Sequence, residues 1–268
     1  MDEKYIIAMT ATQLDMIMTI KNVYNSKFKE IFNIIPKYYT KYSELIETMC
    51  EEKESIKKEL TMKYIFHITI LYDEILKNLY VDNRISVYIL ARTLIESSVK
   101  FIFVQRNDLR ISEILKDSED TIIGRYPIKQ FNEKYNVNIN RVSDNFGLDL
   151  CLKKTGFKTN KKGLSAIIDF IKSKEPDYEI LQKHYKKFCK NIHANLNSIQ
   201  CNACNYLKSN KKDYDYMLSI ILLLNYTLYN VIYELYNGEY KRSINYEEFK
   251  KFDNQYRAMI KLLIKNQK

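Results

Sequence analysis

The sequence predicts an all-α fold, a multi-helix bundle. The 268 residues include only 5 Gly and 3 Pro, whereas the sharp turns of a sheet protein usually require these residues, Asn or Asp. Apolar residues recur at helical spacing along nearly the whole chain, and hydrophobic residues make up 46% of it, which is enough for a buried core. The same composition excludes collagen-like, Pro/Gly-rich disordered and disulfide-stapled chains.

The first part of the chain predicts four helices. The first covers residues 13–35 and ends at Pro36, because proline cannot continue the backbone hydrogen-bond ladder. The second covers residues 38–58 and has the mixed acidic and basic residues of an exposed face. Residues 61–79 and 85–104 form the next two helices, and the short polar turn between them predicts that they are antiparallel neighbours.

The helical pattern weakens over residues 108–163, which contain four of the five glycines. Short helices and loops are expected there instead of one long helix. A short helix follows at residues 164–172, and two long helices, 214–236 and 246–265, finish the chain. No linker forces a boundary, so we expect a single helical domain, residues 1–268, with a looser middle insertion.

The stretch Met217–Tyr233 contains no charged residue. It includes Asn225, Thr227 and Asn230, and its length is at the short limit for crossing a bilayer. We therefore expect a central helix of the bundle and no membrane partner. The amino terminus has acidic residues before any apolar run and lacks the basic start of a signal peptide, so we expect a cytoplasmic protein whose five cysteines are reduced.

Positive charge is concentrated in one segment. The formal net charge is +10, and residues 151–212 carry 14 Lys, no Arg and 4 acidic residues, so the rest of the chain is neutral overall. A general bias toward Lys, Asn, Ile and Tyr is an alternative explanation, but it would not leave the remaining residues balanced. We therefore expect this segment to face RNA or another polyanion.

One set of polar residues lies on the predicted helix 85–104. Arg92, Glu96 and Lys100 follow one another at i, i+4 and i+8 and therefore share a face, with Thr93 beside them. They fit an ordinary surface ion-pair stripe, worth roughly 0.3–0.5 kcal/mol per pair. They equally fit a functional site, because the apolar residues on both sides favour partial burial, and a buried arginine needs a carboxylate.

A second set lies between residues 178 and 197. Helical spacing places Tyr185, Cys189 and His193 on one face, and Asp177 can cap this helix. A lone histidine on such a face is often a hydrogen-bonded structural residue. Here the neighbouring lysines disfavour the charged imidazole, which would keep His193 available as a base. The basic and amide residues around it are Lys183, Lys186, Lys187, Lys190, Asn195 and Asn197.

Together the two segments resemble a group of bacterial helical-bundle proteins that look related to the HEPN superfamily. Their pattern couples an Arg-Thr-x-x-Glu helix to a later Tyr-x-x-(Phe/Leu)-(Ser/Cys)-x-x-(Ile/Val)-His-x-Asn helix. The resemblance covers about 30 residues in two short motifs. The matching residues are Arg92, Thr93 and Glu96 in the first segment and Tyr185, Cys189, His193 and Asn195 in the second.

The resemblance implies a HEPN-like core and the activity of a metal-independent RNA endonuclease of toxin or antiphage-defence type. His193 would act as general acid or base, Arg92 would offset charge on the phosphate, and Glu96 and Tyr185 would support them. It also implies a homodimer with a composite site, and a neutralising partner protein is expected of a toxin. No metal or cofactor is implied.

The chain departs from the usual HEPN signature, in which an Arg precedes the His by four to six residues. The corresponding positions hold Lys186 or Lys187, with Lys190 nearer. Lysine stabilises a phosphate as a point charge but lacks the bidentate guanidinium contact. We therefore expect these lysines and Asn195 to bind RNA, and catalysis would require Arg92 to supply the guanidinium. The alternative is a non-catalytic binding or partner-recognition protein.

A zinc site competes for His193. Cys189, His193, Cys201 and Cys204 supply the ligand types of structural zinc. Their spacing is unusual and no glycine-containing knuckle surrounds the last two, so we favour a site without metal.

The chain has two further histidines and no Gly-rich nucleotide loop, serine-hydrolase elbow or zincin motif. His67 lies among apolar neighbours in the sequence, so we expect a core histidine. His184 is expected to be solvated.

Overall fold

The computed structural model describes most of the central part of the chain and a few positions outside it. The contacts divide the chain into two units, residues 1–52 with 232–268 and residues 53–231. All the helices and sites considered below belong to the second unit. The described residues are 46–47, 54–80, 83–143, 145–174, 178–192, 220, 223–224, 226–227, 229–235 and 254.

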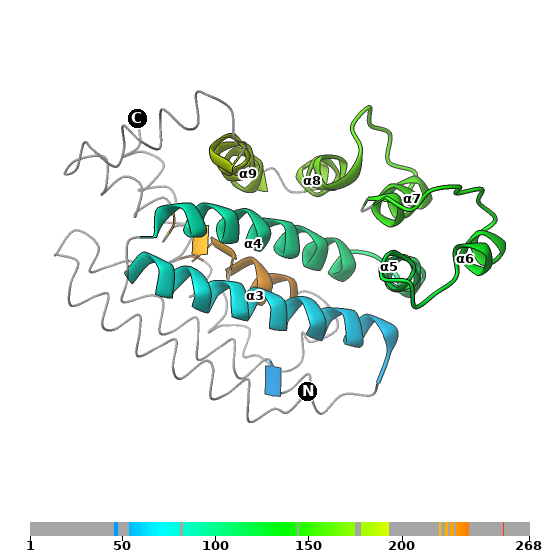
Figure 1. Ribbon diagram of the computed structural model, residues 1–268, viewed down its shortest axis with the longest axis horizontal. Coiled ribbons are helices and arrows are strands. Elements are labelled where there is room, and N and C mark those ends of the chain that lie inside the picture. The colour runs from blue at the N-terminus through cyan, green and yellow to red at the C-terminus, as the bar shows by residue number, and fades with distance from the viewer. Residues whose placement is uncertain are drawn as a thin grey trace. The chain divides into compact units, whose positions relative to one another are not determined.

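The described residues form helices and no strands, which confirms the predicted all-α class and helical bundle for this part of the chain (Figure 1). The helices are α3 (Ile56–Tyr80), α4 (Arg84–Gln105), α5 (Leu109–Ile122), α6 (Ile128–Tyr135), α7 (Phe146–Lys154), α8 (Gly163–Lys174) and α9 (Glu179–Ile192).

The predicted boundary near residue 60 is wrong, because α3 runs without a break from Ile56. The Ser55 hydroxyl accepts a hydrogen bond from the Lys58 backbone N–H at 3.0 Å and so caps the helix start. Lys58, the last residue of the predicted helix 38–58, lies within α3 and is only 6% exposed. The predicted helices 13–35, 38–58 and 246–265 otherwise lie outside the described residues, apart from residues 46–47 and 254, which are helical.

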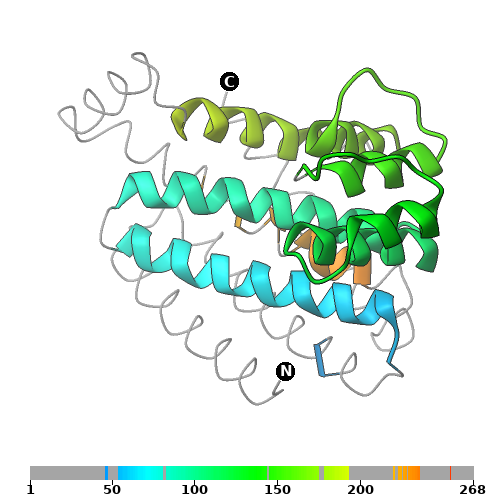
Figure 2. The ribbon, with the colours of Figure 1, turned by 45° about the vertical axis from the view of Figure 1, so that its right-hand side comes forward.

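Helices α3 and α4 form the predicted antiparallel pair and lie side by side in both views (Figures 1 and 2). Asn83 begins α4, since its side chain accepts a hydrogen bond from the Ser86 backbone N–H. At the other end, the Gln105 side-chain amide donates to the Thr61 hydroxyl at 2.6 Å, and Lys57 donates to the last carbonyl of α4, that of Gln105, and to the Asn107 carbonyl just beyond it. A lysine there is favourable because a helix carries partial negative charge at its carboxyl end.

Helix α4 is the helix on which α3, α8 and α9 pack. Near its carboxyl end, residues 101–104 are apolar and fully buried. Phe103, for example, makes an edge-to-face contact with Phe170 of α8, with ring centroids 5.4 Å apart. Part of α4 stays accessible along one side, which we call the polar strip: Arg92, Thr93, Glu96 and Lys100.

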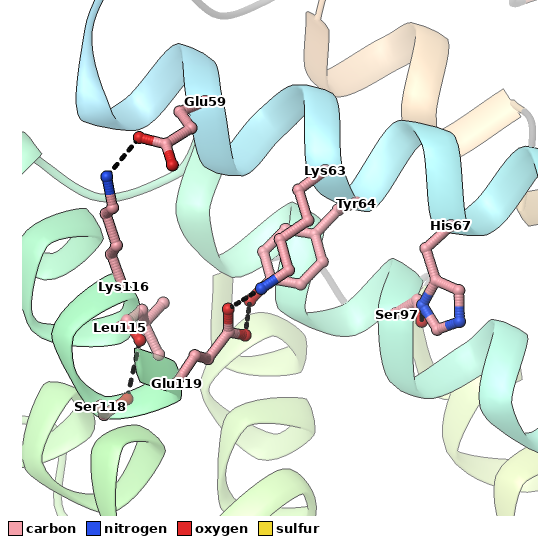
Figure 3. A network of polar contacts seen from close by, with 9 residues as sticks. All are labelled: Glu59, Lys63, Tyr64, His67, Ser97, Leu115, Lys116, Ser118 and Glu119. Atoms are coloured by element: carbon pink, nitrogen blue, oxygen red, sulfur yellow. Dashed lines mark hydrogen bonds and ion pairs between the residues drawn. The ribbon is translucent and has the colours of Figure 1, made fainter. Parts of the chain in front are cut away.

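Polar contacts hold α5 against α3 (Figure 3). The Glu119 carboxylate accepts a hydrogen bond from the Tyr64 hydroxyl at 2.8 Å and pairs with Lys63 at 2.5 Å. One turn away, Lys116 pairs with Glu59. The insertion expected at 108–163 does consist of short helices and loops, α5 to α7, but its first helix is anchored to α3 by charge as well as by apolar burial.

Helix α7 crosses α5 at a glycine. A Cβ built on Gly147 would lie 2.0 Å from the Ser118 hydroxyl oxygen and 2.4 Å from the Ser118 Cβ, so no larger residue fits unless one helix moves. The next connection is held by Asp149, whose carboxylate accepts a hydrogen bond from the Gly163 backbone N–H at 2.6 Å. Gly163 has φ +57° there, which favours glycine.

The described residues of the charge-free stretch 217–233 are helical. Those up to Val231 are buried, and the Thr227 hydroxyl donates to the Leu223 carbonyl at 2.8 Å. Tyr226 packs edge to face against Tyr178, with ring centroids 6.3 Å apart. Among the residues that the structure describes, no helix is long and apolar enough to cross a membrane.

The crossing of α5 and α7 predicts the effect of Gly147→Ala. The added methyl group overpacks the contact with Ser118, so we expect the free energy of unfolding to fall by about 1–3 kcal/mol. Urea denaturation would measure this change. In a Ser118→Gly background the cost of the same substitution should largely disappear. An equal cost in both backgrounds would show that the crossing does not constrain residue 147.

Candidate functional site

Helices α4 and α9 run antiparallel, as three contacts along them show. At one end a terminal nitrogen of Arg106 lies 3.4 Å from the hydroxyl of Tyr178, the residue just before α9. In the middle Glu96 faces Tyr185. At the other end Tyr88 packs on Phe188, with ring centroids 5.6 Å apart. Advancing along α9 therefore moves toward the amino end of α4.

Arg92, Glu96 and Tyr185 come together where these helices meet. Arg92 Nε donates a hydrogen bond to Glu96 Oε1 at 3.0 Å, and the Tyr185 hydroxyl donates to the same oxygen at 3.3 Å. The guanidinium carbon lies 5.8 Å from the centroid of the Tyr185 ring, within the range of a cation–π contact. One carboxylate oxygen thus joins α4 to α9, through the residues Glu96 and Tyr185, which are 89 positions apart in the sequence.

The electrostatics of this cluster keep Tyr185 protonated. Burial, with the negative charges of Cys189 and Glu96, raises the pKa of Tyr185 to about 12, and Arg92 only partly opposes this. A hydrogen bond to Cys189 acts in the same direction. The tyrosine is therefore a hydrogen-bond donor at neutral pH and holds the carboxylate, so it is not a general base.

Arg92 remains charged and accessible. Burial lowers its pKa, but electrostatic interactions with Cys189, Glu96 and Tyr185 outweigh this and raise it. The side chain is 31% exposed, and its terminal nitrogens donate no hydrogen bond to the described residues. An arginine held through Nε, with its outer edge open, can bind a planar or tetrahedral anion.

The remaining predicted site residues are only partly described. His193 and Asn195 lie outside the described residues, as do the side chains of Lys187 and Lys190. Lys186 is exposed on α9. Cys189 is half-buried with a free thiol. Cys201 and Cys204 are also outside the described residues, and within the described ranges no group of three or more His, Cys, Asp or Glu could hold a metal.

Lysines of the 151–212 segment that the structure describes lie on the outside of α7, α8 and α9. These three helices follow one another in a row (Figure 1). Two of the lysines are paired, Lys161 with Asp169 and Lys183 with Glu179 at 3.8 Å. The exposed ones are Lys153, Lys154, Lys158, Lys161, Lys162, Lys174, Lys183 and Lys186. Most of the positive charge of this row therefore faces solvent.

The prediction that His67 is a core histidine is wrong. His67 is exposed on α3, and its Nδ1 lies 3.0 Å from the hydroxyl of Ser97 on α4. Burial, aided by the positive charges of Lys100 and Lys63, lowers its pKa. Its neighbours in the sequence are apolar, but at helical spacing it follows Lys63 by one turn and precedes Glu74 by two. That periodicity marks a polar face and could have identified the exposed histidine.

The expectation that His184 is solvated is also wrong. His184 is half-buried on α9, and its ring stacks on Phe188 with centroids 5.9 Å apart. The aromatic pair of Tyr88 and Phe188 covers this part of the α4–α9 contact. His184 therefore contributes to packing.

Comparison of the chain with protein-family models, with curated proteins and with solved structures found no match.

The shared carboxylate oxygen predicts energetic coupling between Tyr185 and Glu96. In a double-mutant cycle of Tyr185→Phe and Glu96→Ala, we expect a coupling energy of about 0.5–1.5 kcal/mol in urea unfolding, the range of one hydrogen bond. Tyr178→Phe serves as the control, since Tyr178 contacts Arg106 at the other end of α4. It should add to Glu96→Ala without coupling. A coupling near zero for Tyr185 would contradict the observed contact.

The lowered pKa of His67 predicts a pH-dependent stability. The folded chain resists protonation of His67, whereas the unfolded chain protonates it at the usual value near 6.5. Stability should therefore be lost as pH falls below that value, and His67→Gln should remove this part of the loss. The measurement is the unfolding free energy of both proteins at several pH values between 5 and 8. A difference that does not change with pH would refute the assignment.

Proposed function

We propose that this protein is a metal-independent RNA endonuclease of toxin or antiphage-defence type, with Arg92 and His193 at its active site. The proposal rests on the position of Arg92 at the α4–α9 contact. Glu96, itself held by Tyr185, fixes the guanidinium through Nε, and the outer edge of the guanidinium stays accessible. Tyr185 and Cys189 belong to the i, i+4 series whose next member is His193. The resemblance of the two motifs to HEPN nucleases supports the same assignment.

The proposed reaction is an internal transfer at phosphorus. The ribose 2′-oxygen attacks the adjacent phosphorus while His193 removes its proton, and the bond to the 5′-oxygen breaks. The leaving oxygen takes a proton from a protonated imidazole or from water. The products are a 2′,3′-cyclic phosphate and a free 5′-hydroxyl. Arg92 stabilises the negative charge that builds on the phosphoryl oxygens.

Glu96 and Tyr185 are positioning residues in this mechanism. Glu96 fixes the guanidinium through Nε and Tyr185 holds the Glu96 carboxylate, which leaves the outer edge of Arg92 for phosphate. Glu96 also balances one positive charge in a partly buried place. Neither residue is required to gain or lose a proton, which agrees with the raised pKa of Tyr185.

Binding of RNA is supported by the charge of the α7–α9 row. Its exposed lysines, including Lys186, offer point charges to the phosphate backbone without reading sequence. In the proposal Lys187, Lys190 and Asn195 add to this surface. The homodimer and the neutralising partner protein remain expectations from the HEPN resemblance.

A second candidate is a non-catalytic RNA-binding or partner-recognition protein. One observation favours it: lysine stands where HEPN nucleases carry the arginine of their signature. In that case Arg92 and the lysines would bind phosphate without cleaving it. The two candidates share the binding surface and differ only in chemistry.

Cleavage of RNA in the presence of EDTA tests the proposal. We expect the full chain to cut single-stranded or structured RNA and His193→Ala to abolish the cut. Arg92→Lys should slow it by about 10²–10³-fold while RNA affinity changes little, because the loss falls on the transition state. His184→Gln and Arg110→Lys are the matched controls, and both should retain activity.

The outcomes separate the two candidates. An unchanged rate in His193→Ala would refute the active-site assignment. Absence of cleavage by the wild-type chain, together with salt-dependent RNA binding, would favour the non-catalytic protein. Circular dichroism and the urea midpoint of each variant would establish that it is folded.

A further inference from the structure

We propose that His67 and Lys100 form a second anion site that binds a phosphate group. The site lies on the α3 side of α4, whereas Arg92 is held on the α9 side. It uses none of the residues assigned to cleavage above. It therefore does not depend on whether the protein is a nuclease.

Ser97 sets the orientation and the protonation of His67. Ser97 is only 5% exposed, so its hydroxyl proton needs an acceptor. Among the described residues the one atom that can take it is Nδ1 of His67, at 3.0 Å. The neutral imidazole then carries its proton on Nε2. Figure 3 shows the ring lying over Ser97 with one nitrogen toward the serine and the other directed away from it.

The outward nitrogen is a hydrogen-bond donor at an exposed position. His67 is exposed on α3, and within the described part of the chain Nε2 has no partner. A neutral donor held in one orientation by a buried residue loses little conformational entropy when a ligand binds. The partner that Nε2 lacks is a hydrogen-bond acceptor that carries negative charge.

The charges around His67 favour an anion. Lys100 of α4 and Lys63 of α3 are the charged groups that act on the ring. Lys63 is paired with Glu119 of α5, which also accepts a hydrogen bond from Tyr64, and Glu96 of α4 holds Arg92 and Tyr185. Lys100 has no ion pair among the described residues.

A phosphate group fits these partners better than a metal or a neutral ligand. The Lys100 ammonium repels a cation, and a phosphate offers several acceptor oxygens to Nε2 and to that ammonium. Its charge also counteracts the effect of the lysines on the imidazole, so a bound phosphate raises the pKa of His67. By linkage, protonation of His67 strengthens binding, and affinity increases as pH falls from 8 to 6.

The test is a titration of His67 by nuclear magnetic resonance on the full chain. The chain has only 3 His, so single His→Gln variants assign each Cε1–H signal. The probe is inorganic phosphate, with sodium chloride at equal ionic strength as the reference. We expect phosphate to move the His67 midpoint upward and to leave that of His184 in place. In Lys100→Gln the phosphate-induced shift should be clearly smaller.

A second arm distinguishes free phosphate from the RNA backbone. The cleavage-deficient His193→Ala chain is titrated with single-stranded RNA, alone and combined with Lys100→Gln. If the site holds RNA, Lys100→Gln weakens binding and lowers the slope of log affinity against log salt by about 1. Lys129→Gln, an exposed lysine of α6, is the control of equal charge and should leave the slope nearly unchanged apart from nonspecific screening.

The results divide as follows. A phosphate-induced shift at His67 together with the RNA effect supports a backbone site, and the shift without the RNA effect supports a site for free phosphate. A His67 midpoint that does not move with phosphate overturns the proposal, whatever the cleavage assay shows. Because cleavage is not measured, failure here leaves the nuclease proposal intact, and failure of that proposal leaves this one intact.

Discussion

Burial of α4 is the constraint on which the rest of the described unit depends. Three helices pack around it, and residues 101–104 near its carboxyl end are fully buried. Hydrophobic burial of this kind dominates folding free energy. It also limits where chemistry can occur, because the described charged side chains of α4 that stay accessible, Arg92, Glu96 and Lys100, all lie in the polar strip. At one edge of the strip Arg92 lies beside α9. At the other edge Ser97 lies beneath His67 of α3.

Partial burial decides the behaviour of the charged groups at both edges. At the α9 edge a carboxylate is present, so Arg92 keeps its charge and its orientation. At the α3 edge partial burial and the positive charges of Lys100 and Lys63 lower the pKa of His67. Helix α4 therefore carries a fixed cation at one edge and faces the imidazole of α3 at the other. Both arrangements suit a phosphate group, and neither requires a metal.

Charge and packing are divided between different helices. The lysines of α7, α8 and α9 are largely exposed, while α3 and α5 join through Glu119, Tyr64 and Lys63. The first set supplies long-range attraction for a polyanion, which depends on salt. The second set fixes the surface on which His67 lies. An anion drawn by the first could therefore bind at sites whose geometry the second maintains.

Four features could be predicted from local spacing and from the small number of helix-breaking residues: the helical class, the α3–α4 pair, the short helices of the 108–163 insertion and the i, i+4 link of Arg92 to Glu96. Contacts between distant helices cannot be derived in this way. The folded arrangement was needed to show that Tyr185 reaches Glu96, that Gly147 allows α7 to approach α5, and that Ser97 lies beneath His67. The physical reason is that burial and pairing depend on which helix covers which face, and periodicity leaves that choice open.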